Sequence, residues 1–376
     1  MGLIGILWFV SRDTVLPHQM LCQLTGKDAL NDTRPADVYG TDVGIMVARG
    51  VRMYFVFGDT FGLGGLGGLH WRSNTMAYTV DTNPADGVPL TGWITNDSTG
   101  FAKELVSSLK EDNVEMTCIP TAVYDSGACL YLYYMSVKHW GDTGGMWTCN
   151  NASIAYSFDG STFTKAANVS WPGNSNFIEF GVVYGGLDAP IADEYVYLLT
   201  TASGRSHDAY LARVPKTQIL NQSAYAYYAG LALGDKPSWS SFQSEANPVI
   251  DGAMGEMSVM WNSYLHKYML MNLDNPRLAI LLRTADAPWG PWSAPQIVVT
   301  AREHPGLYAP NIHPQWAEDG GRIVYFTMSI WSDYNVFLMK VDLTQLGITV
   351  GAGVFIAWLL PWSLEVQVMS RTEQRR

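Results

Sequence analysis

One local pattern recurs along most of this 376-residue chain and limits the folds open to it. An apolar strand is followed by a turn that contains Gly, Asp or Asn, and then by a second strand rich in Tyr, Phe, Met or Val. The pattern recurs in residues 44–60, 121–137, 189–203, 258–274 and 314–331, with further strand signals between these stretches. Five such units at intervals of roughly 50–80 residues predict an all-β fold, a five-bladed β-propeller with an extra C-terminal tail. Because the spacing is irregular, a β-sandwich is the alternative.

The continuity of this series predicts the domain organisation. No linker rich in Pro, Ser and Gly interrupts it, so we expect residues 1–343 to form one propeller domain and residues 344–376 a C-terminal closing or docking segment. Residues 343–364 carry no charge and are long enough to span a bilayer. Their Gly, Pro, Gln and Ser residues favour a buried closing strand or packed tail over a membrane span. Residues 101–111 are the best candidate for a helix.

A predicted hairpin at residues 38–62 carries an aspartate at each outer end. A two-residue loop at Arg49 and Gly50 would pair Asp42 with Phe57, and Asp59 would then lie diagonally beyond, on the same face as Asp42. Diagonal neighbours lie roughly 7–8 Å apart, which overlaps the separation of about 6.5–9.5 Å between the two carboxyl groups of an inverting glycosidase. A three-residue loop would shift the pairing by one residue, and the two aspartates would then not share a face.

Asp42 and Asp59 are therefore candidates for a catalytic pair at one mouth of the central channel of a propeller. Glycoside hydrolysis needs one carboxylic acid that protonates the leaving oxygen and one carboxylate that activates water or attacks carbon. The apolar neighbours Phe55, Phe57 and Phe61 would raise a carboxyl pKa by desolvation. The alternative is that both aspartates are turn residues, because Gly-Thr-Asp and Gly-Asp-Thr are common loop sequences.

Three further polar residues are candidates for substrate binding. Arg72 and Asn74 follow Asp59 closely in "WRSN", and they would bind sugar hydroxyls or tune the carboxylates. Alternatively, they hold a turn of a blade. Glu256 begins the fourth strand pair and is expected to face the channel, with a structural acid bonded to loop amides as the alternative.

Aromatic residues near the ends of predicted strands are candidates for platforms that stack on sugar rings. They are Trp71, Trp140, Tyr308 and Trp331. Their alternative role is packing between blades, which is where most aromatic residues of a propeller lie. The glycine-rich stretch 61–71 lacks the Gly-Lys-Ser/Thr end of a phosphate-binding loop, so we interpret it as a rim loop.

The composition excludes several classes of function. The formal net charge is −11 and no Lys/Arg cluster precedes the last six residues, so nucleic acid is not an expected partner. A neutral polysaccharide fits better. The four cysteines, Cys22, Cys118, Cys129 and Cys149, have no CxxC spacing, and any pairing among the last three stays open. The histidines have no metal-binding spacing, so we expect no metal and no cofactor.

Taken together, these motifs resemble the family catalogued as domain of unknown function 4185, whose members are classed as glycoside hydrolase family 183. The resemblance runs from about residue 23 to residue 343, and the pairing of "YGTDVG" with "YFVFGDTFG" and "WRSN" is its most specific part. It implies a five-bladed propeller and endo-acting hydrolysis of α-D-arabinofuranose chains in mycobacterial arabinogalactan and lipoarabinomannan. It also implies that Asp42 and Asp59 are the essential acids. The tail after residue 343 and the length of the glycine-rich loop depart from the pattern.

Two other functions remain open from the sequence. A carbohydrate-binding propeller would keep the cleft without the chemistry, and a structural tail protein would need neither. The start of the sequence lacks the three-part pattern of a signal peptide, although the implied substrate lies outside the cytoplasmic membrane. We therefore expect a bacteriophage tail component on the virion that contacts neighbouring tail proteins through residues 347–376. A secreted or membrane-anchored enzyme is the alternative.

Overall fold

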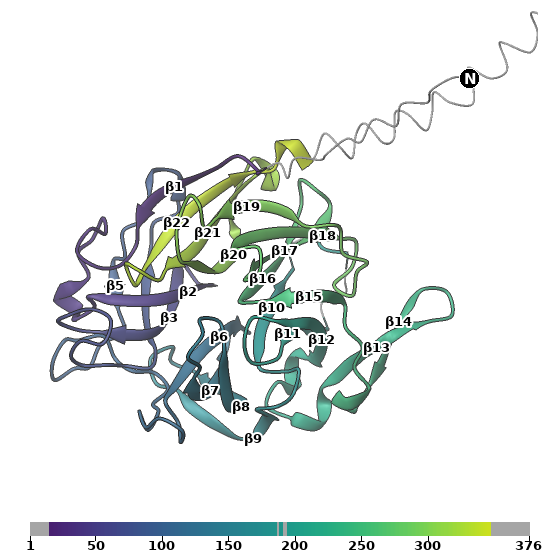
Figure 1. Ribbon diagram of the computed structural model, residues 1–376, viewed down its shortest axis with the longest axis horizontal. Coiled ribbons are helices and arrows are strands. Elements are labelled where there is room, and N and C mark those ends of the chain that lie inside the picture. The colour runs from purple at the N-terminus through teal and green to yellow at the C-terminus, as the bar shows by residue number, and fades with distance from the viewer. Residues whose placement is uncertain (1–14, 186–187, 191–193, 347–376) are drawn as a thin grey trace, which may run out of the picture.

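The computed structural model describes residues 15–185, 188–190 and 194–346. In these ranges the chain is built from β-strands and short 3-10 helices, with residues 344–346 α-helical at the end, which confirms the prediction of an all-β fold. The strands form antiparallel groups around a central region (Figure 1). The predictions for the first 14 residues and for the segment from 347 onward lie outside the described residues.

Two four-stranded sheets follow one another in the first half of the chain. The first contains β2 (Gly40–Arg49), β3 (Arg52–Phe61), β4 (Thr75–Thr79) and β5 (Gly92–Trp93). The second contains β6 (Thr117–Asp125), β7 (Leu130–Trp140), β8 (Trp147–Ser157) and β9 (Thr164–Pro172).

Two further antiparallel groups are joined by a short parallel pairing between their first strands, β10 and β16. One contains β10 (Glu179–Tyr184), β11 (Tyr195–Thr201), β12 (His207–Pro215), β13 (Ala226–Ala232) and β14 (Lys236–Ser240), with β15 (Ile250–Met254) paired to β12. The other contains β16 (Met257–Asn262), β17 (Lys267–Asp274), β18 (Ala279–Ala285) and β19 (Gln296–Thr300).

The last sheet combines both ends of the described chain. It contains β20 (Leu307–Glu318), β21 (Ile323–Ile330), β22 (Asn335–Asp342) and, beside β22, the N-terminal strand β1 (His18–Gln23). Because β1 and β22 are far apart in sequence, their pairing ties the start of the described chain to its end. Short 3-10 helices connect other strands: η1 (Arg34–Ala36), η2 (Pro84–Asp86), η3 (Lys216–Gln218), η4 (Gln222–Ala224), η5 (Gln243–Glu245) and η6 (Asp319–Gly321).

The first strands of the groups contact one another in a closed series. β2 contacts β6, β6 contacts β10, β10 contacts β16, β16 contacts β20, and β20 contacts β2. The strands β2, β6, β10, β16 and β20 therefore surround the centre of the molecule. Within the described ranges, no helix is both long and apolar enough to cross a bilayer.

The hydrophobic core is divided into clusters that lie between neighbouring groups of strands. In β3, Tyr54 and Val56 pack toward the second sheet, whereas Phe55 and Phe57 pack toward the last sheet. Side chains of a strand alternate between the two faces of its sheet. Because both faces of β3 are buried, its residues 53–57 are continuously apolar and do not alternate between apolar and polar residues.

The register predicted for the first hairpin is wrong by one residue at the turn. Arg49 pairs with Arg52, so the loop is Gly50 and Val51, and Gly50 takes the positive φ of 61° that glycine tolerates. The ladder then shifts twice between Thr41 and Ile45. Phe57 therefore lies opposite Val43 and not opposite Asp42. The pairing that was predicted to place Asp42 and Asp59 on one face is not formed, and bulges set the position of Asp42.

The predicted helix at residues 101–111 is not formed. Leu105 and Val106 are adjacent and both buried, and their backbone N–H groups donate to the side-chain oxygen of Asn74. The Asn74 amide in turn donates to the carbonyl of Val106. These hydrogen bonds replace those of a helical turn, and tertiary contacts override the local pattern.

The remaining strand pairs match the predicted ranges except the one at residues 189–203. Among the described residues of that range only β11 forms a strand, and its antiparallel partner on the N-terminal side is β10, which ends at Tyr184. The residues between them include two short stretches outside the described ranges.

Candidate active site

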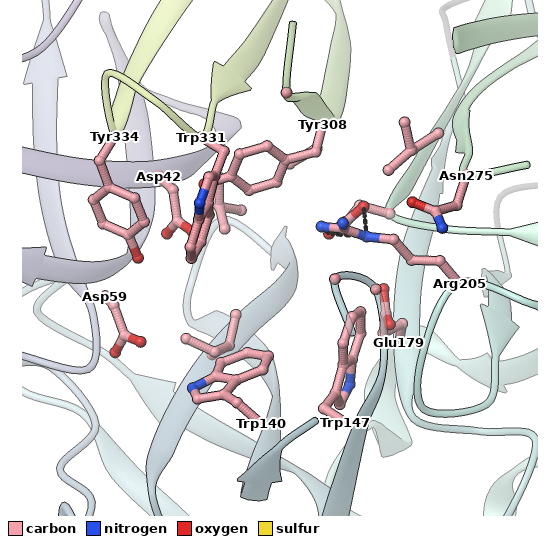
Figure 2. A pocket seen from close by; sticks show the side chains of 18 of the residues that line it. Asp42, Asp59, Trp140, Trp147, Glu179, Arg205, Asn275, Tyr308, Trp331 and Tyr334 are labelled. Atoms are coloured by element: carbon pink, nitrogen blue, oxygen red, sulfur yellow. Dashed lines mark hydrogen bonds and ion pairs between the residues drawn. The ribbon is translucent and has the colours of Figure 1, made fainter. Parts of the chain in front are cut away.

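A cavity of about 1010 Å³ opens where the strands around the centre meet. Asp42, Asp59 and Tyr334 lie at one end of the view in Figure 2, and Glu179 and Arg205 lie at the other. Side chains from all five groups of strands contribute to the lining. The cavity is thus a product of the whole fold and not of one hairpin.

Asp42 lies on β2 within the irregular stretch of the ladder and is 9% exposed. The Tyr308 hydroxyl donates to Asp42 Oδ2 at 2.9 Å. Asp42 Oδ1 is buried and has no hydrogen-bond partner among the residues that the structure describes, and it lies so close to Gly58 that a Cβ there would collide with it. Burial raises the pKa of Asp42 to about 8, with a further contribution from the charge of Asp59.

Asp59 lies near the end of β3 and is 6% exposed. Its Oδ1 accepts hydrogen bonds from Trp71 Nε1 at 2.7 Å and from the Thr117 hydroxyl. Burial raises the pKa of Asp59 to about 7, while these two hydrogen bonds and the positive charge of Lys110 limit the rise. With Oδ1 engaged by two donors, Oδ2 is the oxygen available to a water or a ligand in the cavity.

The two carboxyl groups therefore differ in the pH at which they ionise. Asp42 keeps its proton to about pH 8 and Asp59 to about pH 7. Near neutral pH either carboxyl group can therefore carry a proton. Carboxyl groups whose pKa lies near the working pH are suited to general acid–base catalysis.

Two tyrosines support this carboxyl pair. Burial and the charge of Asp42 hold the pKa values of Tyr308 and Tyr334 well above their ordinary range, so both stay neutral hydrogen-bond donors. Tyr334 has a positive φ of 47°, and its ring meets that of Trp331 edge-on, with the ring centroids 5.6 Å apart. A strained backbone at a candidate site indicates that the surrounding fold fixes its geometry.

All four predicted stacking residues line the cavity. Trp331 is 58% exposed and offers a ring face to a ligand, whereas Tyr308 is buried. Trp71 is held by its hydrogen bond to Asp59. The stacking of these residues on sugar stays a prediction.

Glu256 also lines the cavity, as the sequence predicts. Its carboxylate accepts hydrogen bonds from Arg205 Nε at 3.1 and 3.2 Å and is therefore paired with a guanidinium, not with loop amides. Arg205 is further flanked by the rings of Trp147 and Tyr308 at 5.6 and 5.3 Å.

Arg72 and Asn74 are not among the residues that line the cavity. Arg72 is 8% exposed, and its guanidinium donates to the side chain and the backbone carbonyl of Asp37. Asn74 is fully buried, with its amide engaged by backbone groups of the 105–106 segment and of Cys118. Both residues therefore hold the local structure, which is the alternative role that the sequence left open, and we propose no substrate contact for them.

Sequence reasoning missed several residues of the cavity. They are Glu179, Arg205, Trp147 and Tyr334, and it also missed Thr117, which does not line the cavity but donates to Asp59. Glu179 carries a signal that could have revealed it, since it is an acid flanked by Phe and Ile in "NFIEFGVV", at the start of a buried strand. The hydroxyl of Thr117 and the ring of Tyr334 carry no comparable signal.

No cluster of three or more His, Cys, Asp or Glu residues that could hold a metal ion occurs in the described ranges. The four cysteines are free thiols.

The chain matches the family described as "Domain of unknown function (DUF4185)" over residues 28–340, and it belongs to that family. It is also 31% identical over 193 residues to "Notoamide biosynthesis cluster protein J" of Aspergillus sp. (strain MF297-2), a match that covers 50% of this chain and 48% of the relative. The chain thus spans about half the length of the curated relatives it matches.

Two solved structures show which fold this chain resembles. An exo-beta-1,3-galactanase of Phanerochaete chrysosporium is similar with a TM-score of 0.54 at 10% identity, over 87% of this chain and 65% of that one. A family 117 glycoside hydrolase of Zobellia galactanivorans is similar with a TM-score of 0.50 at 11% identity, over 88% of this chain and 92% of that one. At such low identity the similarity establishes the fold alone.

Proposed function

We propose that this protein is a glycoside hydrolase in which Asp42 and Asp59 form the acid–base pair. The observation that carries the proposal is that two buried carboxyl groups with raised pKa values, about 8 and about 7, line one cavity. The glycoside hydrolases among the structural neighbours support it by analogy of fold. Perturbed carboxyl groups in a large cavity are the usual mark of a catalytic site.

In this proposal Asp42 is the acid and Asp59 is the base. Asp42 gives its proton to the glycosidic oxygen as the bond from that oxygen to the anomeric carbon breaks. Asp59 Oδ2 takes a proton from a water whose oxygen attacks the same carbon from the opposite face, which inverts its configuration. The assignment follows the hydrogen-bond partners, because Trp71 and Thr117 both donate to Asp59 Oδ1 and favour its ionised form, whereas Asp42 Oδ1 has no partner among the described residues.

We further propose that the substrate is the α-D-arabinofuranosyl chain of mycobacterial arabinogalactan and lipoarabinomannan, cleaved at internal linkages. Membership of the family supports this through the resemblance of its motifs to glycoside hydrolase family 183. A cavity with exposed aromatic surface suits a neutral sugar polymer. In the same proposal, the five groups of strands are the five blades of a propeller, with the first strand of each blade around the channel.

The place of action is a separate proposal. We propose that the protein acts outside the cell on the mycobacterial envelope as part of a phage tail, where residues 347–376 contact neighbouring tail proteins. Mass spectrometry of purified phage particles and of host membrane fractions tests this. Detection only in membranes or medium of uninfected cells would contradict it.

The function is tested by incubating the protein with purified arabinogalactan and separating the products by chromatography. We expect oligosaccharides from the unmodified protein, and none from Asp42→Asn or Asp59→Asn. Asp97→Asn, at an exposed loop residue, is the matched control and should keep full activity. Binding without cleavage by the unmodified protein would instead support the carbohydrate-binding propeller.

A further inference from the structure

The end of the cavity opposite the aspartate pair contains a buried acid to which the proposed reaction gives no role. Glu179 is the first residue of β10, lines the cavity and is 3% exposed. Its Oε1 is buried without a hydrogen-bond partner in the described part of the chain. A buried polar atom without a partner destabilises a folded protein, so it needs an explanation.

Arg205 lies nearby but does not neutralise Glu179. Its guanidinium is already paired with Glu256 through Nε and Nη2. Burial, followed by the charge of Glu256, raises the pKa of Glu179 well above its ordinary range, while Arg205 opposes this rise. Burial thus favours the protonated form of Glu179, which can both donate and accept a hydrogen bond.

The surroundings of Glu179 suit a sugar ring. Trp147, Arg205 and Asn275 also line this part of the cavity (Figure 2). Trp147 supplies an aromatic surface, while the paired Arg205 and the amide of Asn275 supply polar groups. Since the one guanidinium is already matched by Glu256, an anionic ligand would find no free positive charge here and would face two acids.

We infer that Glu179 and the Arg205–Glu256 pair form a subsite for a neutral sugar ring, in which the Glu179 carboxyl group hydrogen-bonds a ring hydroxyl. The inference rests on the proposed function in that it takes the ligand to be a carbohydrate. A hydroxyl both donates and accepts, so it satisfies the unpartnered oxygen of Glu179. Tyr308 connects the two ends of the cavity, because its hydroxyl contacts Asp42 and its ring faces Arg205.

This role differs from that of a catalytic acid. Glu179 lies at the end of the cavity away from Asp42 and Asp59, so it is not one of the proposed acid–base pair (Figure 2). A carboxyl group held neutral in an apolar site acts well as a hydrogen-bond donor. Glu179 is thus assigned to recognition of a ring next to the cleaved linkage.

The test measures binding in the full-length Asp59→Asn protein, so that no probe is cleaved. The probe is the linear oligosaccharide fraction released from mycobacterial arabinogalactan by mild acid, titrated by calorimetry. We expect Glu179→Leu to lower affinity about tenfold or more, because it removes a buried hydrogen bond to the ligand. Glu179→Gln should restore most of this loss, since its amide also donates and accepts. Glu111→Leu, at an exposed residue, is the control and should bind normally.

The outcomes separate this inference from the proposed reaction. Unchanged affinity in Glu179→Leu, or equal losses in the Leu and Gln variants, would overturn the subsite. In the otherwise unmodified protein, a Glu179→Gln variant with kcat abolished and KM unchanged would make Glu179 a catalytic acid and would also overturn it. If Glu179→Leu does not fold, as judged by circular dichroism, Glu179→Met replaces it. Loss of binding in Glu179→Leu together with no cleavage by the unmodified protein would support the subsite and refute the hydrolase.

Discussion

Replacing Asp42 with asparagine should make the folded protein more stable at neutral pH, although it should abolish activity. Burial raises the pKa of Asp42 from 3.8 to about 8. In the unfolded chain at pH 7 the carboxyl group is ionised, whereas in the folded protein it holds a proton. Folding at pH 7 therefore requires the Asp42 carboxylate to bind a proton, which costs free energy because this pH lies above the unfolded pKa. An asparagine side chain removes this cost.

The size of the effect follows from the difference between the two pKa values. For a carboxyl group whose folded pKa is raised, stability is fully present below the unfolded pKa of 3.8 and is lost as pH rises to the folded pKa of about 8. Each pH unit in this window costs about 1.4 kcal/mol. At pH 7 the accumulated cost is about 4 kcal/mol. The asparagine amide, placed against Gly58, has its own cost of burial, which lowers the net gain but does not depend on pH.

The assay is urea unfolding of the wild type and of Asp42→Asn at several values between pH 5 and pH 8. The difference in unfolding free energy between the two proteins should grow in favour of the variant by about 3 kcal/mol from pH 5 to pH 7. Asp97→Asn, at an exposed site, should show no such trend. A difference that is constant with pH, or that shrinks as pH rises, would refute the assignment of Asp42 as a buried protonated acid.

Three further predictions concern activity. The rate should show a bell-shaped pH profile with its maximum between the pKa values of about 7 and about 8. Protonation of Asp59 removes the base below this window, and ionisation of Asp42 removes the acid above it. A maximum near pH 5 would contradict the assignment. Gly58→Ala should lower kcat at least tenfold, because the added Cβ displaces the Asp42 carboxyl group. Gly185→Ala is the control, because Gly185 also has no positive φ and its added Cβ would meet only Ala189 at 3.6 Å, an ordinary contact. Trp331→Ala should raise KM by about five- to tenfold with kcat nearly unchanged, because an exposed stacking surface is removed; an equal fall in kcat would place Trp331 in the catalytic step. Each is measured by steady-state kinetics on arabinogalactan fragments.

The two aspartates illustrate how far local sequence reasoning extends. The motifs around Asp42 and Asp59 singled out both residues, and the structure places both in one cavity. The geometric reason given for their proximity is wrong, however, because the loop is shifted by one residue and bulges interrupt the ladder. Bulges and a positive φ at Val43 depend on contacts such as that between its N–H and Ser329 Oγ, which lies far away in the chain.

Arg72 and Glu179 show the complementary limit. Arg72 is near Asp59 in sequence, yet its hydrogen bonds to Asp37 hold it away from the cavity. Glu179 is distant from both aspartates in sequence, yet it shares their cavity because β10 lies beside β6 and β16 around the centre. Proximity in the chain is a poor guide to a site that all the groups of strands build together.

The sequence by itself determined the strand content, the apolar character of strands with two buried faces, and the pair of acids flanking the first hairpin. These properties are local, since they depend on side-chain periodicity and turn residues within a few positions. Only the tertiary structure decided which residues share the cavity, which carboxyl groups hold protons, and that Leu105 and Val106 form no helix. Burial and partners set these properties, and both arise when strands far apart in sequence close around one centre.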